Sequence, residues 1–273
     1  MKQDLIAVVG ATGKTGRRVL TSLQEQGCQV RALSRTSKIP FDWENRETWK
    51  PALTDIHSVY VTYYPDLAVP EAQNDIQAFV DLAQSMGVNH LVLLSGRGEQ
   101  GAQNAEQVVI NSTLEWNIVR ASWFMQNFSE SFMLEGIQAG QLVLPEHMAL
   151  EPFIDVDDIA DVVVAALTRD ELRNQVLEVT GPELLSFAQC VDVTAEMLQR
   201  DIQLLTVPIE SYLEGAEAQG MPADIAWLIN ELFVNVLDGR NESTTNTIET
   251  ILQRPAKTFK DYAQDTAATG VWS

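Results

Sequence analysis

Short apolar runs alternate with amphipathic stretches through the first two thirds of the chain. Several runs are apolar nearly throughout, as expected for strands that are covered by helices on both faces. The predicted strands are Leu5–Val9, Gln29–Ser34, Val59–Thr62, His90–Ser95, Asn117–Arg120 and Val176–Thr180. The predicted helices between them are Gly13–Glu25, Pro70–Met86 and Ala102–Ser112. This alternation predicts an α/β fold with a doubly wound parallel sheet.

The pattern changes after Ser122, where the chain becomes aromatic and then largely helical. The acidic run Asp155–Asp158 precedes an apolar helical stripe and is typical of a helix N-terminus. The segment Pro222–Leu237 has the periodicity of an amphipathic helix. We therefore predict a smaller, mostly helical C-terminal lobe. The predicted division is a sheet domain at 1–125, completed by about 150–180, and a lobe formed by 126–149 and 181–273.

Composition excludes several classes of protein. The chain has 273 residues and is 45% hydrophobic, which is enough for a substantial core. No run approaches the roughly 18 apolar residues that cross a membrane. Cys28 and Cys190 cannot form a disulfide framework and have no metal-ligand partners near them in the sequence. The sequence predicts a cytoplasmic protein without a metal site, as a monomer or a homodimer.

Charge is unevenly distributed along the chain. The net charge of −20 argues against nucleic acid as a partner. Residues 1–40 nevertheless carry +5, and the remainder carries −25. The cations of this first segment are Lys2, Lys14, Arg17, Arg18, Arg31, Arg35 and Lys38. Arg17 and Arg18 are equally compatible with a solvated helix face, but the cluster as a whole favours a small polyanion.

A glycine-rich turn follows the first predicted strand and opens the first predicted helix. It reads Gly10-Ala11-Thr12-Gly13-Lys14-Thr15-Gly16. Glycines at these positions allow positive φ, close approach of a pyrophosphate and close packing of helix on strand. The helix N-terminus then faces the phosphates. In this context the turn predicts a dinucleotide-binding Rossmann fold.

The end of the second strand favours NADP(H) over NAD(H). An NAD site typically has an acidic residue there, which accepts a hydrogen bond from the ribose 2′-hydroxyl. This strand ends Ser34-Arg35-Thr36-Ser37-Lys38, without an acid. A carboxylate would repel a 2′-phosphate, whereas Arg35 can pair with it and Ser34 can add a hydroxyl donor.

Together with this turn and strand end, several later phrases resemble the NmrA-like atypical short-chain dehydrogenases/reductases. The resemblance runs almost from end to end. The phrases are Phe41-Asp42-Trp43, Leu94-Ser95, RASWFMQNF at 120–128, PFIDVDDIA at 152–160, TGPELLS at 180–186 and TFKDYA at 258–263. Within this family the chain is most similar to the ergot-alkaloid-type imine reductases, such as festuclavine and agroclavine dehydrogenases.

The resemblance implies further cofactor contacts. Asp42 resembles the acid that bonds the adenine amino group, with Trp43 beside it, although Asp42 could also cap the following helix. Ser95 matches the serine position at the end of a strand. Thr62, Tyr63 and Tyr64 fall where a strand ends against the ribose and phosphates, and the two tyrosines could also be packing residues.

One departure from the family concerns its catalytic dyad, Tyr-x-x-x-Lys. The segment after Ser95, GRGEQGAQNAEQVVINSTLEW, contains neither tyrosine nor lysine. The usual phenol acid therefore cannot operate, and carbonyl reduction by that route is disfavoured. A nucleotide-sugar epimerase shares the phrase DVDDIA but needs the same dyad, and is disfavoured for that reason.

Two functions remain open. The first is a reductase of a small apolar imine, quinone or enone that does not need the dyad, because an iminium carbon is already cationic. Its candidate polar residues near the nicotinamide are Ser95, Arg97 and Asn127. Its candidate pocket wall consists of Trp123, Phe124, Met125, Phe128 and Trp227, which could also be core. The second is a non-catalytic redox sensor that binds NADP(H) and acts through a regulatory protein partner.

Overall fold

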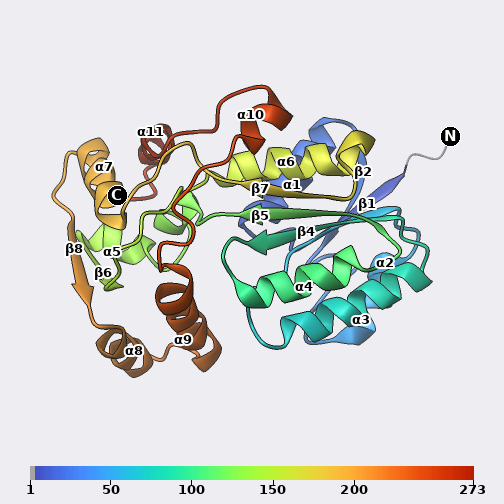
Figure 1. Cartoon of the computed structure of the whole chain (residues 1–273), viewed down its shortest axis with the longest axis horizontal. Coiled ribbons are helices and arrows are strands. Elements are labelled where there is room, and N and C mark those ends of the chain that lie inside the picture. Colours follow the sequence, from blue (N-terminus) through green and yellow to red (C-terminus); the bar gives the residue numbers. More distant parts are fainter. Residues whose placement is uncertain (1–3) are drawn as a thin grey trace.

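A six-stranded parallel sheet forms the centre of the molecule (Figure 1). The computed structural model describes residues 4–273, so the predicted cation Lys2 lies outside the described residues. The strand order is β2-β1-β3-β4-β5-β7. The strands are β1 (Leu5–Val9), β2 (Gln29–Leu33), β3 (Ser58–Val61), β4 (His90–Gly96), β5 (Glu115–Ala121) and β7 (Gln175–Val179). Each of the six predicted strands is confirmed to within a few residues.

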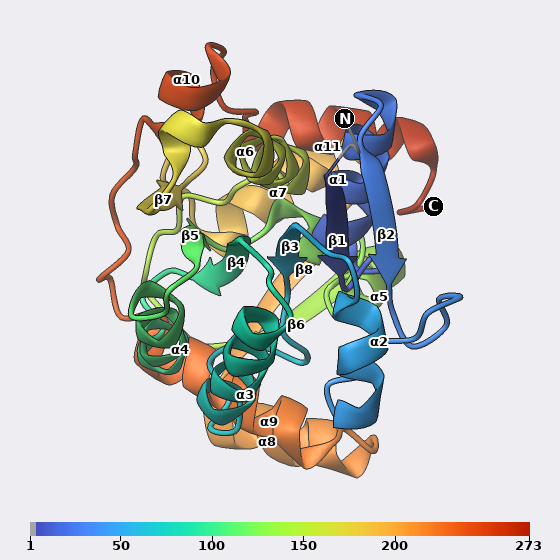
Figure 2. The same ribbon diagram turned by 90° about the vertical axis from the view of Figure 1, so that its right-hand side faces the viewer.

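Helices cover both faces of the sheet, as Figure 2 shows. On one face, α2 (Trp49–Leu53), α3 (Ala72–Ser85) and α4 (Gln100–Ile110) share an apolar core with the strands. On the other face, α1 (Lys14–Glu25), α6 (Val156–Thr168) and α10 (Thr247–Leu252) form a second core. This burial explains why the strands are apolar on both sides, and it confirms the doubly wound α/β fold.

The sheet reverses its direction of growth at β1. Its neighbours on the two sides are β2 and β3, which follow it in turn along the chain. Such a reversal opens a crevice at the carboxyl ends of the strands, where ligands of open α/β sheets bind. The turn after β1 lies at this crevice.

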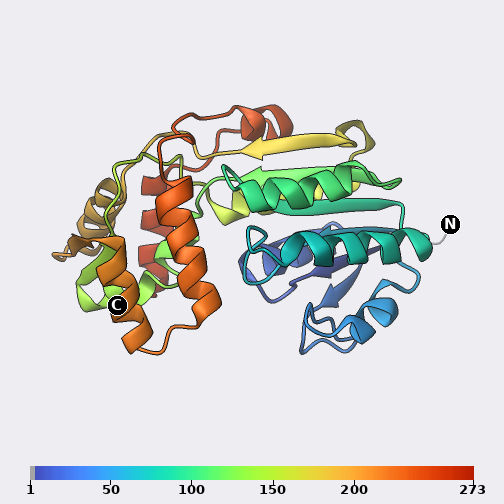
Figure 3. The same ribbon diagram turned by 60° about the horizontal axis from the view of Figure 1, so that its bottom comes forward.

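A second group of elements lies beyond the carboxyl ends of the strands (Figure 3). It comprises the short 3₁₀ turn Met125–Phe128, α5 (Leu134–Ala139), β6 (Gln141–Pro145), α7 (Phe187–Leu198), β8 (Gln203–Val207), α8 (Ile209–Ala218), α9 (Ala223–Asn230) and α11 (Phe259–Thr269). An aromatic core holds these elements together, with Phe128, Phe153, Phe187 and Phe259 in edge-on contact. The lobe is mostly helical, as predicted.

Three details of this second group differ from the prediction. β6 and β8 form a two-stranded parallel sheet that the sequence analysis did not predict. The helix predicted at Pro222–Leu237 consists of α9 followed by a π-helical segment, Glu231–Val236. The chain then returns to the large sheet, although the whole of 181–273 was predicted to belong to the lobe. There α10 buries Ile248 and Ile251 against α6. That return ties the end of the chain to both parts of the molecule.

No helix within residues 4–273 is long and apolar enough to cross a membrane.

Candidate nucleotide-binding and reaction site

The turn between β1 and α1 is too tight for larger residues at two of its glycines. Gly10 has φ of +74°, and a Cβ added there would lie 2.1 Å from the hydroxyl oxygen of Thr62. A Cβ on Gly16 would lie 2.1 Å from the carbonyl oxygen of Gly10. Gly13 is the N-cap of α1 and supplies no capping side chain, so the helix N-terminus is open to an anion. This cradle fits a dinucleotide diphosphate.

The side chains of the turn divide between solvent and core. Thr12 is exposed and Lys14 is half-buried. Burial lowers the pKa of the Lys14 ammonium, and the nearby Glu130 carboxylate opposes that shift. Thr15 is buried, and its hydroxyl accepts a hydrogen bond of 2.9 Å from the fully buried Tyr60 phenol. Burial of Tyr60 raises the pKa of that phenol. Thr15 therefore anchors α1 to β3, a structural role that the sequence analysis did not foresee.

Arg35 and Tyr64 meet above the ends of β2 and β3. The Arg35 guanidinium lies 5.6 Å from the centre of the Tyr64 ring, and both side chains are exposed. The structure therefore brings together two residues that were predicted separately from different strands. Ser34 is buried, and its hydroxyl bonds those of Ser37 (2.8 Å) and Thr36 (3.3 Å), so it shapes this turn.

Asp42 and Trp43 lie beside the same strand ends. The indole of Trp43 donates to the carbonyl oxygen of Thr62 (3.0 Å), and its ring centre lies 4.8 Å from that of Tyr63. The Tyr63 phenol donates to the Asp75 carboxylate at 2.7 Å, and burial raises its pKa, as does the Asp75 bond. Within the described residues, the Asp42 carboxylate accepts only a local backbone N–H, that of Glu44 at 3.2 Å. It is half-buried and remains available to a ligand.

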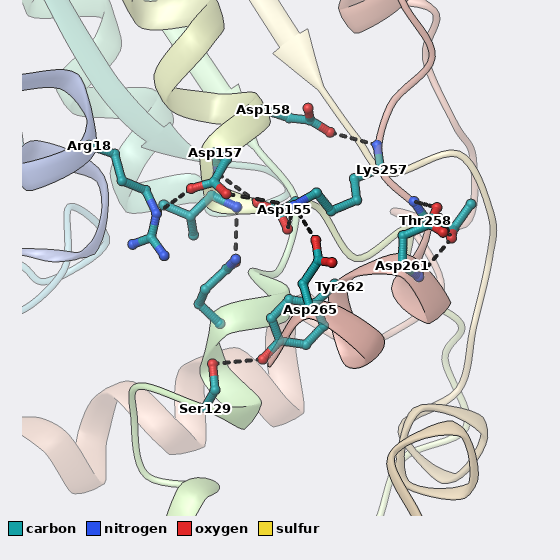
Figure 4. Close-up of polar contacts among 12 residues, drawn as sticks. Arg18, Ser129, Asp155, Asp157, Asp158, Lys257, Thr258, Asp261, Tyr262 and Asp265 are labelled. Carbon is teal, nitrogen blue, oxygen red and sulfur yellow. Dashed lines mark hydrogen bonds and ion pairs between the residues drawn. The ribbon is translucent and has the colours of Figure 1, made fainter. Parts of the chain in front are cut away.

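Three of the six described cations of the predicted basic cluster bind protein partners, which corrects the interpretation of the cluster as a whole. Arg17 and Arg18 both pair with Glu130 of the second lobe, and Arg18 also pairs with Asp157. Figure 4 shows Arg18 and Lys257 meeting the acidic N-terminus of α6. Arg31 donates to the carbonyl oxygens of Ala52 and Thr54. Within the described residues, Lys14, Arg31, Arg35 and Lys38 are the cations of this segment that form no ion pair, and Arg31 is held by backbone carbonyls instead.

The N-terminus of α6 holds the lobe against the phosphate-binding helix. Asp155 caps α6 by accepting from the Asp157 backbone N–H at 2.7 Å, which confirms the predicted cap. Burial opposes ionisation of Glu130, but hydrogen bonds from Arg18 and Arg17 hold its pKa below the usual value. The positive charges of Arg17 and Arg18, which were predicted to attract a ligand, therefore join α1 to the second lobe.

Ser95, a candidate for both catalysis and cofactor binding, serves a buried ion pair. Its hydroxyl donates to the Glu106 carboxylate at 2.6 Å. Glu106 is fully buried and receives the Arg120 guanidinium on both oxygens, with Nε at 2.9 Å from Oε1. The structure thus gives Ser95 a fixed partner beneath the carboxyl edge of β4 and β5.

Arg97, a second catalytic candidate, has every nitrogen engaged by the protein. Nε donates to Glu178 at 2.8 Å, and Nη1 donates to the carbonyl oxygens of Asn241 (2.7 Å) and Ser243 (2.8 Å). Nη2 donates to the Ser243 hydroxyl. With 9% of its surface exposed, Arg97 fastens the returning C-terminal segment to the sheet. Asn127, the third candidate, is half-buried in the turn after β5.

The predicted aromatic pocket wall is largely lobe core. Met125 and Phe128 have no exposed surface and pack within the core of the second lobe. Trp123 is 9% exposed and stands edge-on to Phe187 and Phe233. These side chains are buried because they join the lobe to the end of β5.

Two pocket candidates retain exposed surface. Trp227 on α9 is 38% exposed, and Phe124 is half-buried against the sheet-side core. His147 was missed by the sequence analysis. Its ring lies 4.7 Å from that of Phe187 and 5.5 Å from that of Phe233, and burial lowers its pKa.

Two buried side-chain oxygens at the carboxyl edge of the sheet have neither a hydrogen-bond nor an ion-pair partner among residues 4–273. They are the Ser122 hydroxyl, directly after β5, and Oε2 of Glu151. Glu151 is 1% exposed, and its backbone bonds that of Leu185 in both directions. Neither residue belongs to a motif with a known chemical meaning, so sequence reasoning had no signal for them. Unpaired buried polar atoms are rare and mark places where a ligand can complete the bonding.

Two further acids were missed near the same edge. Asp66 follows β3, and Glu99 precedes α4. Their carboxyl groups hydrogen-bond each other, and the pKa of each is raised, first by burial. A Cβ on Gly96 would lie 2.1 Å from the Glu99 carboxyl, so that glycine makes room for it.

Glu151 predicts a measurable pH dependence of stability. Burial raises its pKa to about 7 from the ordinary 4.5, although Arg97 and a hydrogen bond from Asn241 oppose the shift. Its neutral form is thus favoured in the folded state, and the associated stability is present at acidic pH and lost as the pH rises toward 7. Relative to Glu151→Gln, the wild type should lose about 3 kcal/mol of unfolding free energy between pH 4 and pH 8. Urea unfolding of both proteins across this range measures the difference. A constant difference would contradict the raised pKa.

The donor set fits a nicotinamide dinucleotide better than a metal ion. The glycine cradle, the open helix N-terminus and the two unpaired oxygens lie along the edge where such a cofactor binds. Within residues 4–273, no group of three or more His, Cys, Asp and Glu is arranged to hold a metal.

Comparison with known proteins assigns the family. No known protein-family profile matches the chain. It is 30% identical to festuclavine synthase II of Penicillium roqueforti, across 95% of this chain and 97% of that protein. It is 28% identical to the NAD(P)H azoreductase of Xenophilus azovorans, across 97% of this chain and 98% of that protein. An NADPH-dependent quinone oxidoreductase of Escherichia coli, solved with NADPH, shares the fold with a TM-score of 0.80 at 15% identity, across 95% of this chain and 99% of that one. The chain therefore belongs to the NmrA-like family of atypical short-chain dehydrogenases/reductases and has its NAD(P)-binding Rossmann-type fold.

Proposed function

We propose that the protein is an NADPH-dependent reductase of a small, largely apolar substrate, of the imine, quinone, enone or azo class. The observation that carries the cofactor assignment is the exposed Arg35 guanidinium over Tyr64, beside the glycine cradle. The relatives named festuclavine synthase and azoreductase support a reductase. When bound, the cofactor supplies a hydride from its nicotinamide ring.

The chain's own residues would bind and orient this cofactor. Gly13 and the first turn of α1 would hold the diphosphate, with Lys14 beside it. Arg35 would pair with the 2′-phosphate, and Asp42 would accept from the adenine amino group. Trp43 and the backbone around Thr62 would then shape the wall on the adenosine side.

The second lobe would close the reaction site at the carboxyl ends of β4 and β5. Trp227 on α9 and Phe124 after β5 keep exposed apolar surface that could line it, and Asn127 could add an amide. We propose that the lobe, essentially 126–149 and 181–273, excludes water from the substrate, and that the returning segment held by Arg97 fixes its position.

The function is tested by following NADPH absorbance with representative quinones, enones, azo dyes and cyclic imines. Reduction of at least one class, with one NADPH oxidised for each two-electron product, supports the proposal. Tight NADP(H) binding without oxidation across all four classes would contradict it and would favour the redox-sensor hypothesis.

Arg35 predicts the cofactor preference. Charge-assisted bonds to phosphate contribute about 1.5–3 kcal/mol, so Arg35→Ala should weaken NADPH binding about 10- to 100-fold. NADH binding should change little, because NADH lacks the 2′-phosphate. Fluorescence titration with both nucleotides measures this. Lys260→Ala is a matched control, because Lys260 is an exposed cation on α11. Equal losses for NADPH and NADH would refute the assigned contact.

A further inference from the structure

Glu151 is buried beside the carboxyl ends of the strands of the large sheet. The segment that follows it crosses this edge: Ile154 N–H donates to the carbonyl of Trp123 (2.9 Å), and Pro152 accepts from Gly181 N–H (3.0 Å). Trp123 follows β5 by two residues and Gly181 follows β7 by two. Glu151 thus lies beside the carboxyl ends of β5 and β7, at the edge of the sheet where open α/β sheets bind their ligands.

The protein fixes one side of the Glu151 carboxyl and leaves the other without a partner. Asn241 hydrogen-bonds the carboxyl group and also donates from Nδ2 to the carbonyl of Arg97 at 3.1 Å. Oε2 is buried and unpaired within residues 4–273. Leaving a buried polar atom unpaired costs stability, and native proteins retain such atoms chiefly where function needs them.

The charged groups around Glu151 do not neutralise its carboxyl group. Arg97 from the end of β4 is the nearby cation, but its Nε donates to Glu178 of β7 at 2.8 Å and its other nitrogens to the C-terminal segment. Glu242 of that segment adds negative charge. Glu151 itself forms no ion pair within the described part of the chain. The carboxyl group is therefore poised to hold a proton.

Other buried groups at this edge are less suitable. The Asp66 and Glu99 carboxyl groups hydrogen-bond each other. The Asp155 carboxylate, whose Oδ2 is also unpaired by hydrogen bonds, has the Lys257 ammonium at 3.5 Å. Glu151 and Ser122 are left, and of these two the carboxyl is the better acid.

We propose that Glu151 is the catalytic proton donor of this enzyme, replacing the tyrosine of the missing Tyr-x-x-x-Lys dyad. This inference rests on the proposed reductase function. For a quinone or enone, the substrate takes a hydride from the reduced nicotinamide and a proton from the Glu151 O–H. A carbon–hydrogen and an oxygen–hydrogen bond form as the conjugated π system is reduced. The oxidised nicotinamide and the Glu151 carboxylate remain, and water reprotonates the carboxylate.

The first arm of the test measures the carboxyl group without turnover. Infrared titration of wild type minus Glu151→Gln should reveal one protonated carboxyl that titrates near neutral pH. Its midpoint should be lower with NADP⁺ bound than with NADPH, because the cationic nicotinamide favours the carboxylate. NADP(H) binding with an identical midpoint in both redox states would overturn the inference while leaving the proposed function intact. Absence of NADP(H) binding would overturn both.

The second arm separates proton donation from a structural role. Glu151→Gln keeps the shape and the oxygen that Asn241 can bond, but it removes the acid. With a quinone or enone, kcat should fall about 100-fold or more with little change in KM. With a preformed iminium ion, which needs only a hydride, kcat should change less than about 3-fold. Equal losses on both substrate classes, or no loss on either, would overturn the assignment.

Glu146→Gln is the matched control, because Glu146 is exposed on the same connecting segment. It should leave both reactions unchanged. Thermal unfolding at pH 6 should show that Glu151→Gln is folded, since the wild-type carboxyl is largely neutral there.

Discussion

Replacing Gly16 by alanine is expected to abolish useful NADP(H) binding. The added Cβ would lie 2.1 Å from the Gly10 carbonyl oxygen and 2.7 Å from its carbon, and both are backbone atoms that cannot move alone. α1 would have to shift away from the turn by about 1 Å, a displacement that can cost about 100-fold in activity at a precisely built site. We expect at least this loss in kcat/KM for NADPH, measured from initial rates.

Gly215→Ala provides the control for this substitution. Gly215 lies within α8, and a Cβ there would meet nothing within 4 Å. Alanine is a better helix former, so this variant should be stabilised by up to about 1 kcal/mol and should bind NADPH normally. If Gly16→Ala bound NADPH as well as the control does, the cofactor would not use this turn.

Removing the Glu106 carboxylate is expected to cause the largest loss of stability. Glu106 is fully buried, bonds Arg120 through both oxygens and accepts from Ser95. Truncation to alanine would leave the guanidinium and the hydroxyl without their main partner, and breaking such a buried pair costs about 3–5 kcal/mol. Urea unfolding of Glu106→Ala measures this loss directly.

Glu214→Ala is the comparison for this prediction, because Glu214 is an exposed carboxylate within α8. Its effect should stay within about 0.5 kcal/mol. A loss of under about 1 kcal/mol for Glu106→Ala would show that the pair contributes little beyond what water would supply. Ser95 would then regain its place as a candidate for catalysis.

The large sheet was predictable from sequence because its signals are local. Runs such as Leu5–Val9 and His90–Gly96 are apolar on both faces, and the glycine turn follows the first of them directly. β6 and β8 escaped prediction because they lie in the part of the chain whose pattern is mainly helical, and they pair with each other across more than 60 positions.

The roles of individual polar residues depended on partners that the sequence does not reveal. Arg18 meets Glu130 and Asp157 from more than 100 positions away, and Arg97 meets Asn241 and Ser243. A cation beside a glycine turn resembles a phosphate ligand until such acids are placed next to it. Glu151 was overlooked for the opposite reason, since its unpaired oxygen is evident only once the surrounding chain is folded.

The central claim, that this chain binds NADP(H) through its glycine turn and Arg35, is tested most directly by calorimetric titration of the wild-type protein. NADPH and NADH should be compared at one ionic strength. We expect one NADPH site per chain, with NADH bound at least about 10-fold more weakly because it lacks the phosphate that pairs with Arg35. Equal or tighter binding of NADH, or no binding of either nucleotide, would contradict it.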